Sequence, residues 1–126
     1  MHLKFKDLLE MAERLRGENG CPWDKKQTIA SMRKCVVDES EELSQAILNE
    51  DTENIEEEIG DLLFTLILIA QIAREEGKFD MGTVMQKNAE KLIERQTWVF
   101  GTDKAKTAEE ALELWNRNKQ NKRKKQ

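Results

Sequence analysis

The alternation of apolar and polar positions along the chain predicts a series of helices joined by short polar breaks. Residues 4–16 place apolar side chains three and four positions apart, which is the spacing of one helix face. The same spacing returns over residues 28–48, and again after the polar turn at 49–54 as far as about Glu76. Because the turn is short, these two long helices are expected to lie antiparallel to each other.

Helix-ending and helix-starting residues place two more helices in the C-terminal third of the chain. Gly77 is expected to end the third helix, and Asp80 to cap a fourth helix that runs to about Trp98. The segment Thr107–Glu110 has the pattern of a capping box, which predicts a short fifth helix that reaches Trp115.

The composition agrees with a helical domain. The 126 residues include one proline and six glycines, too few turn-forming residues for a fold of many short strands. The only proline lies in residues 17–24, which are expected to form the main loop. The sequence therefore predicts an all-α fold, with a four-helix-bundle-like core of antiparallel helices, a short C-terminal helix and an oligomeric state.

The oligomeric state is predicted from the third helix, where residues 62–73 carry no charge and are apolar almost all round. A helix of this kind is buried on every side, and in a chain of this size a second copy must cover part of it. We expect a homodimer or a homotetramer.

The apolar run of residues 62–73 also bears on location. Its twelve residues are too few for a membrane span, which takes about 20. With no apolar leader after Met1, and with Cys21 and Cys35 read as free thiols, the expected location is the cytoplasm.

Charge divides the chain into two parts. Residues 117–126 carry six basic side chains and no acidic one, whereas the preceding 116 residues carry a net charge of −10. We predict a helical domain over residues 1–116 and a basic, disordered tail over residues 117–126. The acidic body argues against a specific nucleic-acid partner, because it would repel phosphates.

The acidic residues are concentrated between residues 38 and 61. These 24 positions hold 11 Asp or Glu residues and neither Lys nor Arg. Such a segment is either a face exposed to solvent or a site whose charge a bound cation neutralises.

The helical periodicity favours the cation. Glu39 falls inside the apolar arc of its helix, Glu42 lies at the edge of that arc, and the two are three positions apart. Glu58 and Asp61 repeat this spacing on the next helix, just before the apolar run, so that Asp61 is expected to face packed side chains. Four carboxylates without a histidine or thiolate suit Mg²⁺, with Mn²⁺ as a substitute, better than zinc.

Two further groups of residues suggest contacts to a substrate. Asn88, Lys91 and Arg95 form one stripe on the fourth predicted helix, where they could bind phosphate groups. The tryptophans Trp23, Trp98 and Trp115 could stack on a base or act as packing residues, and Trp115 could cover the site from the last helix.

Several segments resemble the MazG-type nucleotide pyrophosphohydrolases. Residues 14–28 contain Cys-Pro-Trp-Asp and then Gln-Thr, as in that family. Residues 38–42 and 58–61 resemble its EExxE and ExxD motifs, and residues 77–80 and 91–101 are similar to its closing segments.

The resemblance implies an all-α enzyme that needs Mg²⁺ and splits nucleoside triphosphates between the α and β phosphates. The products would be a nucleoside monophosphate and pyrophosphate, and the role would be removal of unwanted (deoxy)nucleotides. It also implies that Glu39, Glu42, Glu58 and Asp61 bind the metal, and that the Lys and Arg positions of the fourth helix contact phosphates.

Two positions depart from the family pattern. Asp38 stands where the family has Glu, although the helical wheel points it away from the site. The segment Gln96-Thr97-Trp98 replaces a His-Pro-His. Two alternatives therefore accompany the broad enzyme: a narrower pyrophosphatase of the phosphoribosyl-ATP, dUTP or dCTP type, and a catalytically silent helical module for dimerisation or regulation.

Overall fold

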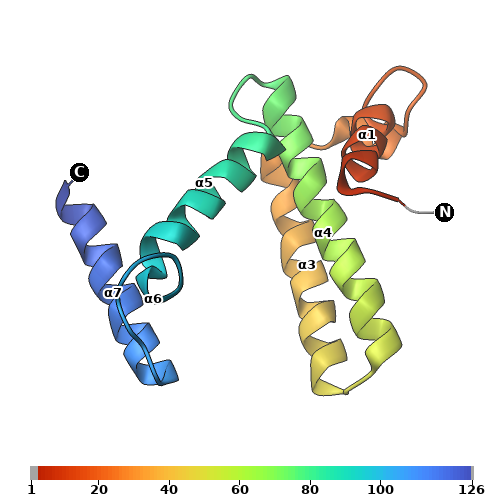
Figure 1. Cartoon of the computed structure of the whole chain (residues 1–126). Coiled ribbons are helices and arrows are strands. Elements are labelled where there is room, and N and C mark those ends of the chain that lie inside the picture. The colour runs from red at the N-terminus through yellow and green to blue at the C-terminus, as the bar shows by residue number, and fades with distance from the viewer. Residues whose placement is uncertain (1–2, 126) are drawn as a thin grey trace. The chain divides into compact units, whose positions relative to one another are not determined.

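The computed structural model describes residues 3–125, with side chains for residues 3–122, and its elements are all helices. Residues 1–2 and 126, at the ends of the predicted domain and tail, lie outside the described residues. In chain order the helices are α1 (Phe5–Leu15), α2 (Pro22–Lys26), α3 (Ile29–Leu48), α4 (Thr52–Glu75), α5 (Met81–Arg95), α6 (Thr97–Phe100) and α7 (Ala108–Lys125) (Figure 1). The all-α prediction is confirmed for the described residues.

The helices belong to two compact units that divide after Met81. The first unit contains α1 to α4, and the second contains α5 from Gly82 onward together with α6 and α7. The first unit thus supplies three of the four helices of the predicted bundle. The four-helix core as a whole stays a prediction.

The first unit is built on the antiparallel pair of α3 and α4, with α1 packed on α4. Thr28 is the N-cap residue of α3, and its hydroxyl accepts a hydrogen bond from the Ser31 amide at 3.0 Å. Asp51 is the N-cap residue of α4, and its carboxylate accepts a hydrogen bond from the Asn54 amide. Five buried side chains form the core that holds the three helices together: Ala12, Met32, Ile67, Leu68 and Ile72.

The chain alone does not bury the apolar helix α4 on every side. This agrees with the expectation that a second copy covers part of it. Ile67 and Ile72 are each 1% exposed, whereas Leu66 and Ile59 are 44% and 53% exposed. One side of the helix faces the core, and part of its other side is left without a cover in the single chain. None of the described helices is long and apolar enough to cross a membrane.

The second unit is held together by a polar network in which α6 packs on α7. The Asn118 amide donates hydrogen bonds to the Arg95 carbonyl and to the Thr97 hydroxyl, at 2.9 and 3.0 Å. The Thr97 hydroxyl lies 2.6 Å from the carboxylate of Asp103, and Arg117 forms an ion pair with that carboxylate. These contacts join the end of α5 to the middle of α7.

Three predictions of local structure were wrong. The expected loop contains the short helix α2, which begins at Pro22, a favourable residue in a first helical turn. The fourth helix ends at Arg95, three residues early, and α6 follows as a separate turn. The last helix, predicted to be short, is long: α7 runs to Lys125 and includes the described part of the tail. The ion pair of Lys122 with Glu94 on α5, at 2.9 Å, helps to hold it.

Replacing Ile67 and its neighbour Leu66 by alanine tests the packing of α4. Ile67→Ala should lower the free energy of unfolding by about 2–5 kcal/mol, because it leaves a cavity in the core. Leu66→Ala should change it by only about 0.5 kcal/mol in dilute protein, because Leu66 is exposed. Urea unfolding followed by circular dichroism measures both values. An equal loss for the two variants would show that α4 is enclosed on every side.

Candidate metal centre between α3 and α4

Four carboxylates meet on the facing sides of α3 and α4. Glu39 and Glu42 come from α3, and Glu58 and Asp61 come from α4. Carboxylate oxygens of Glu39, Glu58 and Asp61 all lie within 4.8 Å of one another. The carboxyl group of Glu42 lies close enough to Glu39 and Glu58 to raise the pKa of both. The structure therefore brings together three of the four acids that the helical wheel had selected, with Glu42 beside them.

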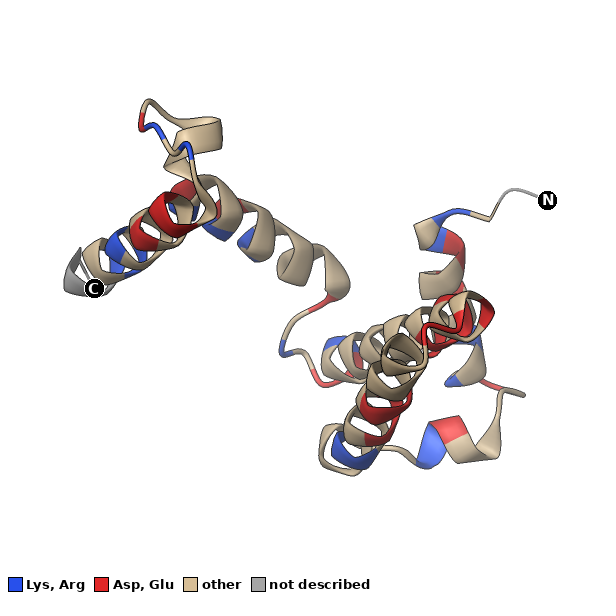
Figure 2. Ribbon diagram, turned by 90° about the horizontal axis from the view of Figure 1, so that it is seen from below, with Lys and Arg blue, Asp and Glu red and all other residues tan. Residues whose placement is uncertain are grey.

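The helix geometry explains why these side chains converge. A spacing of three residues places two side chains on one face of each helix, and the antiparallel pairing turns the two faces toward each other. Figure 2 shows acidic residues along both helices of this hairpin. Glu58 is only 8% exposed, whereas Glu42 and Asp61 are exposed. The expectation that Asp61 faces packed side chains was wrong, because its carboxylate borders an open cavity.

Burial and clustering make Glu39 and Glu58 hard to ionise. Burial raises the pKa of Glu58 to about 7, with further contributions from the hydrogen bond to Glu42 and from the charges of Glu42, Asp61 and Glu39. Burial also raises the pKa of Glu39, as do the charges of Glu42 and Asp61. No ion pair among the described side chains involves any of the four acids. The described side chains therefore do not neutralise this charge through ion pairs.

Two oxygens of the cluster have no hydrogen-bond partner although they are buried. They are Oε2 of Glu39 and Oε2 of Glu58. Leaving such an acceptor unsatisfied costs about 1–3 kcal/mol in a folded protein, so that buried polar atoms almost always have partners. A divalent cation would satisfy both oxygens, and an all-carboxylate donor set fits Mg²⁺ or Mn²⁺.

A cavity of about 310 Å³ opens beside the cluster. It is lined by acidic, aromatic and aliphatic side chains: Trp23, Asp24, Met32, Cys35, Glu39, Asp61, Phe64, Thr65 and Leu68. A cavity of this size and mixed character suits an organic ligand that carries a charged group. Sequence reasoning missed Asp24 as a lining residue, although its place in the Cys-Pro-Trp-Asp segment was an available signal.

The other predicted substrate contacts lie in the second unit. Asn88 and Lys91 are exposed on α5. Arg95 is only 9% exposed, and its guanidinium carbon lies 5.4 Å from the centre of the Trp115 ring, in a cation–π contact. The Nε atom of Arg95 is buried without a hydrogen-bond partner. The structure thus joins Arg95 to Trp115 and leaves Asn88 and Lys91 open to solvent.

The two departures from the family pattern have structural explanations. Asp38 forms an ion pair with Lys34 one helical turn away, at 2.8 Å, and takes no part in the cluster. Thr97, in the middle of Gln96-Thr97-Trp98, contributes its hydroxyl to the network with Asn118 and Asp103. Both segments therefore have a structural role in this chain.

Comparison with known proteins gives concordant matches. The family model described as the MazG nucleotide pyrophosphohydrolase domain matches residues 27–100. A nucleoside triphosphate pyrophosphohydrolase of Escherichia coli K12 is 41% identical over 113 residues, which are 89% of this chain and 43% of that protein. A nucleoside triphosphate pyrophosphohydrolase/pyrophosphatase MazG of Thermotoga maritima is 41% identical over 97 residues, 77% of this chain and 38% of that protein. The chain thus spans less than half the length of these two relatives.

A solved structure agrees with the fold. The crystal structure of a mazG-related protein from Thermotoga maritima matches with a TM-score of 0.76 and 35% sequence identity. The match covers 91% of this chain and 98% of that one.

The raised pKa of Glu58 predicts how stability depends on pH. Without metal, the folded state binds more protons than the unfolded state between about pH 4.5 and 7, so that stability should fall as the pH rises through this window. Glu58→Gln should flatten the fall. Mg²⁺ should raise the melting temperature more at pH 8 than at pH 5.5, because protons compete with the metal.

Thermal unfolding in chelator and in Mg²⁺, at several pH values, measures these effects. The lowered pKa values of Glu75 and Asp103 act below this window and do not disturb it. Equal pH slopes for the wild type and Glu58→Gln would contradict the assignment of the proton to the cluster.

Proposed function

The chain belongs to the MazG nucleotide pyrophosphohydrolase family, and we propose that it hydrolyses (deoxy)nucleoside triphosphates to the monophosphate and pyrophosphate with the help of Mg²⁺. One observation carries the proposal. The acids at the family's motif positions form a cluster with two buried, unpartnered oxygens and no cation from the protein. Such an arrangement destabilises the folded state on its own, and a bound metal ion would remove that cost.

In this proposal Glu39, Glu42, Glu58 and Asp61 hold the metal. When bound, Mg²⁺ supplies charge neutralisation for the triphosphate and lowers the pKa of a coordinated water. Glu58 gives up its proton when the metal binds, because a ligand carboxylate must be ionised. Mn²⁺ is expected to replace Mg²⁺, since both take oxygen ligands.

The substrate contacts in the second unit belong to the same proposal. Lys91 and Arg95 are proposed to bind the phosphate chain, with Asn88 as a hydrogen-bond donor beside them. The buried, unpartnered Nε of Arg95 supports this, because it leaves one donor free for an anion. Trp115, whose ring already lies against Arg95, is proposed to cover the bound nucleotide.

The proposed enzyme is a homodimer or a homotetramer. The support is the apolar surface of α4 that the single chain leaves exposed, including Ile59 and Leu66. We propose that a second copy covers this surface.

Pyrophosphate release from the eight common NTPs and dNTPs, with Mg²⁺ and with chelator, tests the activity. Glu42→Gln should lower kcat about 100-fold or more, because it removes a proposed metal ligand. Glu57→Gln is the matched control, since Glu57 is an exposed acid of the same segment outside the cluster. It should behave as the wild type.

The pattern of release separates the alternatives. Release from a single nucleotide would favour the narrower pyrophosphatase. No release from any nucleotide or from phosphoribosyl-ATP, in protein shown to be folded and loaded with metal, would overturn the enzyme and leave the silent helical module.

A further inference from the structure

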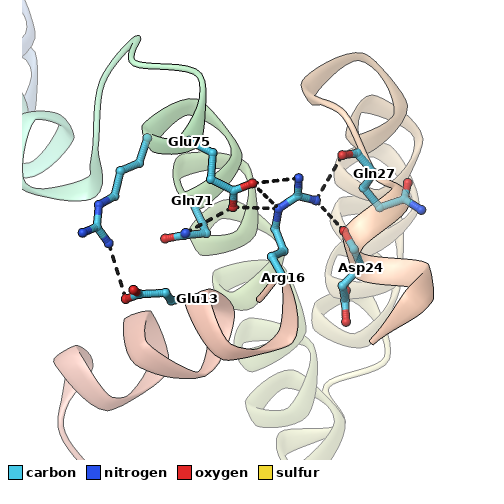
Figure 3. Close-up of polar contacts among 7 residues, drawn as sticks. Glu13, Arg16, Asp24, Gln27, Gln71 and Glu75 are labelled. Atoms are coloured by element: carbon cyan, nitrogen blue, oxygen red, sulfur yellow. Dashed lines mark hydrogen bonds and ion pairs between the residues drawn. The ribbon is translucent and has the colours of Figure 1, made fainter. Parts of the chain in front are cut away.

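The first turn beyond α1 contains a buried arginine whose bonds reach three other segments. Arg16 follows α1 as its C-cap residue, and its side chain is 9% exposed. Its Nε and Nη2 atoms donate hydrogen bonds to the carboxylate of Glu75, in the last turn of α4, at 2.9 and 3.1 Å (Figure 3). The hydrogen bond from Arg16 lowers the pKa of Glu75, so that the pair stays charged well into acidic solution.

The remaining donor of this guanidinium holds α2. Its Nη1 atom donates to the carbonyl oxygens of Asp24 and Gln27, the second at 3.0 Å. Carbonyls at the end of a helix have no partner within the helix, and Arg16 satisfies that of Gln27. The Asp24 carbonyl accepts from the Gln27 amide as well, at 3.3 Å, so that Arg16 is its second donor. The Gln27 side chain continues the network, because its amide donates to the Trp23 carbonyl and its oxygen accepts from the Ser31 hydroxyl, at 2.9 and 2.7 Å.

These bonds hold the end of α2, whereas its start is held by the hydrogen bond from the Cys21 amide to the Leu15 carbonyl at 2.8 Å. The helix has five residues, and none of them is buried, so that no core side chain anchors it. Yet Trp23 and Asp24 line the cavity that also contains Glu39 and Asp61. The wall of the cavity that Trp23 and Asp24 form is therefore held by polar contacts that converge on one arginine.

We propose that Arg16, oriented by Glu75, is a positioning residue for nucleotide binding, because it places the Trp23–Asp24 wall of the cavity beside the acid cluster. The proposal rests on the proposed function for its ligand, a metal-bound nucleotide. The four acids lie on α3 and α4, whose pairing is made by their own core side chains. Loss of Arg16 should therefore weaken nucleotide binding and spare metal binding.

Arg16→Gln tests the proposal, with Arg74→Gln as the matched control. Arg74 also joins α4 to α1, through an exposed ion pair with Glu13 at 3.4 Å, and its side-chain hydrogen bonds among the described residues do not reach α2. Arg16→Gln should raise KM about tenfold or more and leave kcat within about threefold. The substitution removes the charge-assisted hydrogen bonds that order the Trp23–Asp24 wall, and this wall is proposed to act in nucleotide binding. Arg74→Gln should change neither.

Two binding measurements accompany the kinetics. The Kd of Mn²⁺ alone, from its electron paramagnetic resonance signal, should be unchanged in Arg16→Gln. The Kd of the α,β-methylene analogues of ATP, GTP, CTP and UTP with Mg²⁺, from calorimetry, should rise by the same factor as KM. A loss of metal affinity as large as the loss of nucleotide affinity would overturn the proposal, since Arg16 would then support the whole hairpin.

A charge exchange separates positioning from stability. Arg16→Glu combined with Glu75→Arg restores an ion pair between α1 and α4, but it takes the donor away from the end of α2. We expect the melting temperature to recover and KM to stay raised. Recovery of both would overturn the proposal. Where Arg16→Gln does not fold, Arg16→Lys serves instead, because one ammonium group cannot replace the forked contacts of a guanidinium.

Failure of the proposed function and failure of the role of Arg16 give different results in these experiments. A wild type that binds metal and analogue without hydrolysis would overturn the proposed function, and the analogue Kd of Arg16→Gln would still decide the role of Arg16. A wild type that hydrolyses nucleotides, with Arg16→Gln indistinguishable from Arg74→Gln, would overturn the role of Arg16 alone.

Discussion

The mutual repulsion of four carboxylates on two facing helices is the constraint on which the rest of this structure depends. Glu39 and Glu58 have raised pKa values because burial and neighbouring acids disfavour their ionised forms. The protein places no Lys or Arg among them, although it uses ion pairs elsewhere on the described surface. A fold that tolerates this cluster needs stabilising contacts close by, and the chain places its best packing on the same hairpin.

That packing begins one turn beyond the acids. On α4 most residues from Thr65 to Ala73 are buried, beginning one turn after Asp61, and on α3 the buried Met32 precedes Glu39. The hydrophobic contacts hold the two helix axes, and the helix axes hold the carboxylates at their separation. The apolar side chains thus position the polar cluster by fixing the two helices that carry it. This is a rigid support of the kind that a metal site needs, since its ligands must stay together before the ion arrives.

Sequence reasoning succeeded for features that periodicity determines and failed where tertiary contacts decide. The long helices and the convergence of Glu39, Glu42, Glu58 and Asp61 result from a spacing of three or four residues, which one sequence displays. The short helix α2 is completed by hydrogen bonds from Arg16, and the length of α7 depends on contacts with residues at least 14 positions away, such as that of Arg117 with Asp103. No local pattern reports such partners. The apolar run of α4 predicted that a second copy covers part of this helix, but the run does not say which of its sides the chain itself covers.

The two walls of the cavity are supported in different ways, and this has a consequence for how such a site can change. The acidic wall belongs to long helices with a shared core, so that its geometry cannot shift without loss of the fold. The Trp23–Asp24 wall belongs to five residues held by polar bonds around Arg16, and side chains there can be exchanged at little cost to packing. The support of the four carboxylates and the support of the Trp23–Asp24 wall are therefore separable in this architecture. In the proposed enzyme, substitutions in α2 are expected to alter which nucleotide fits while the four carboxylates stay in place.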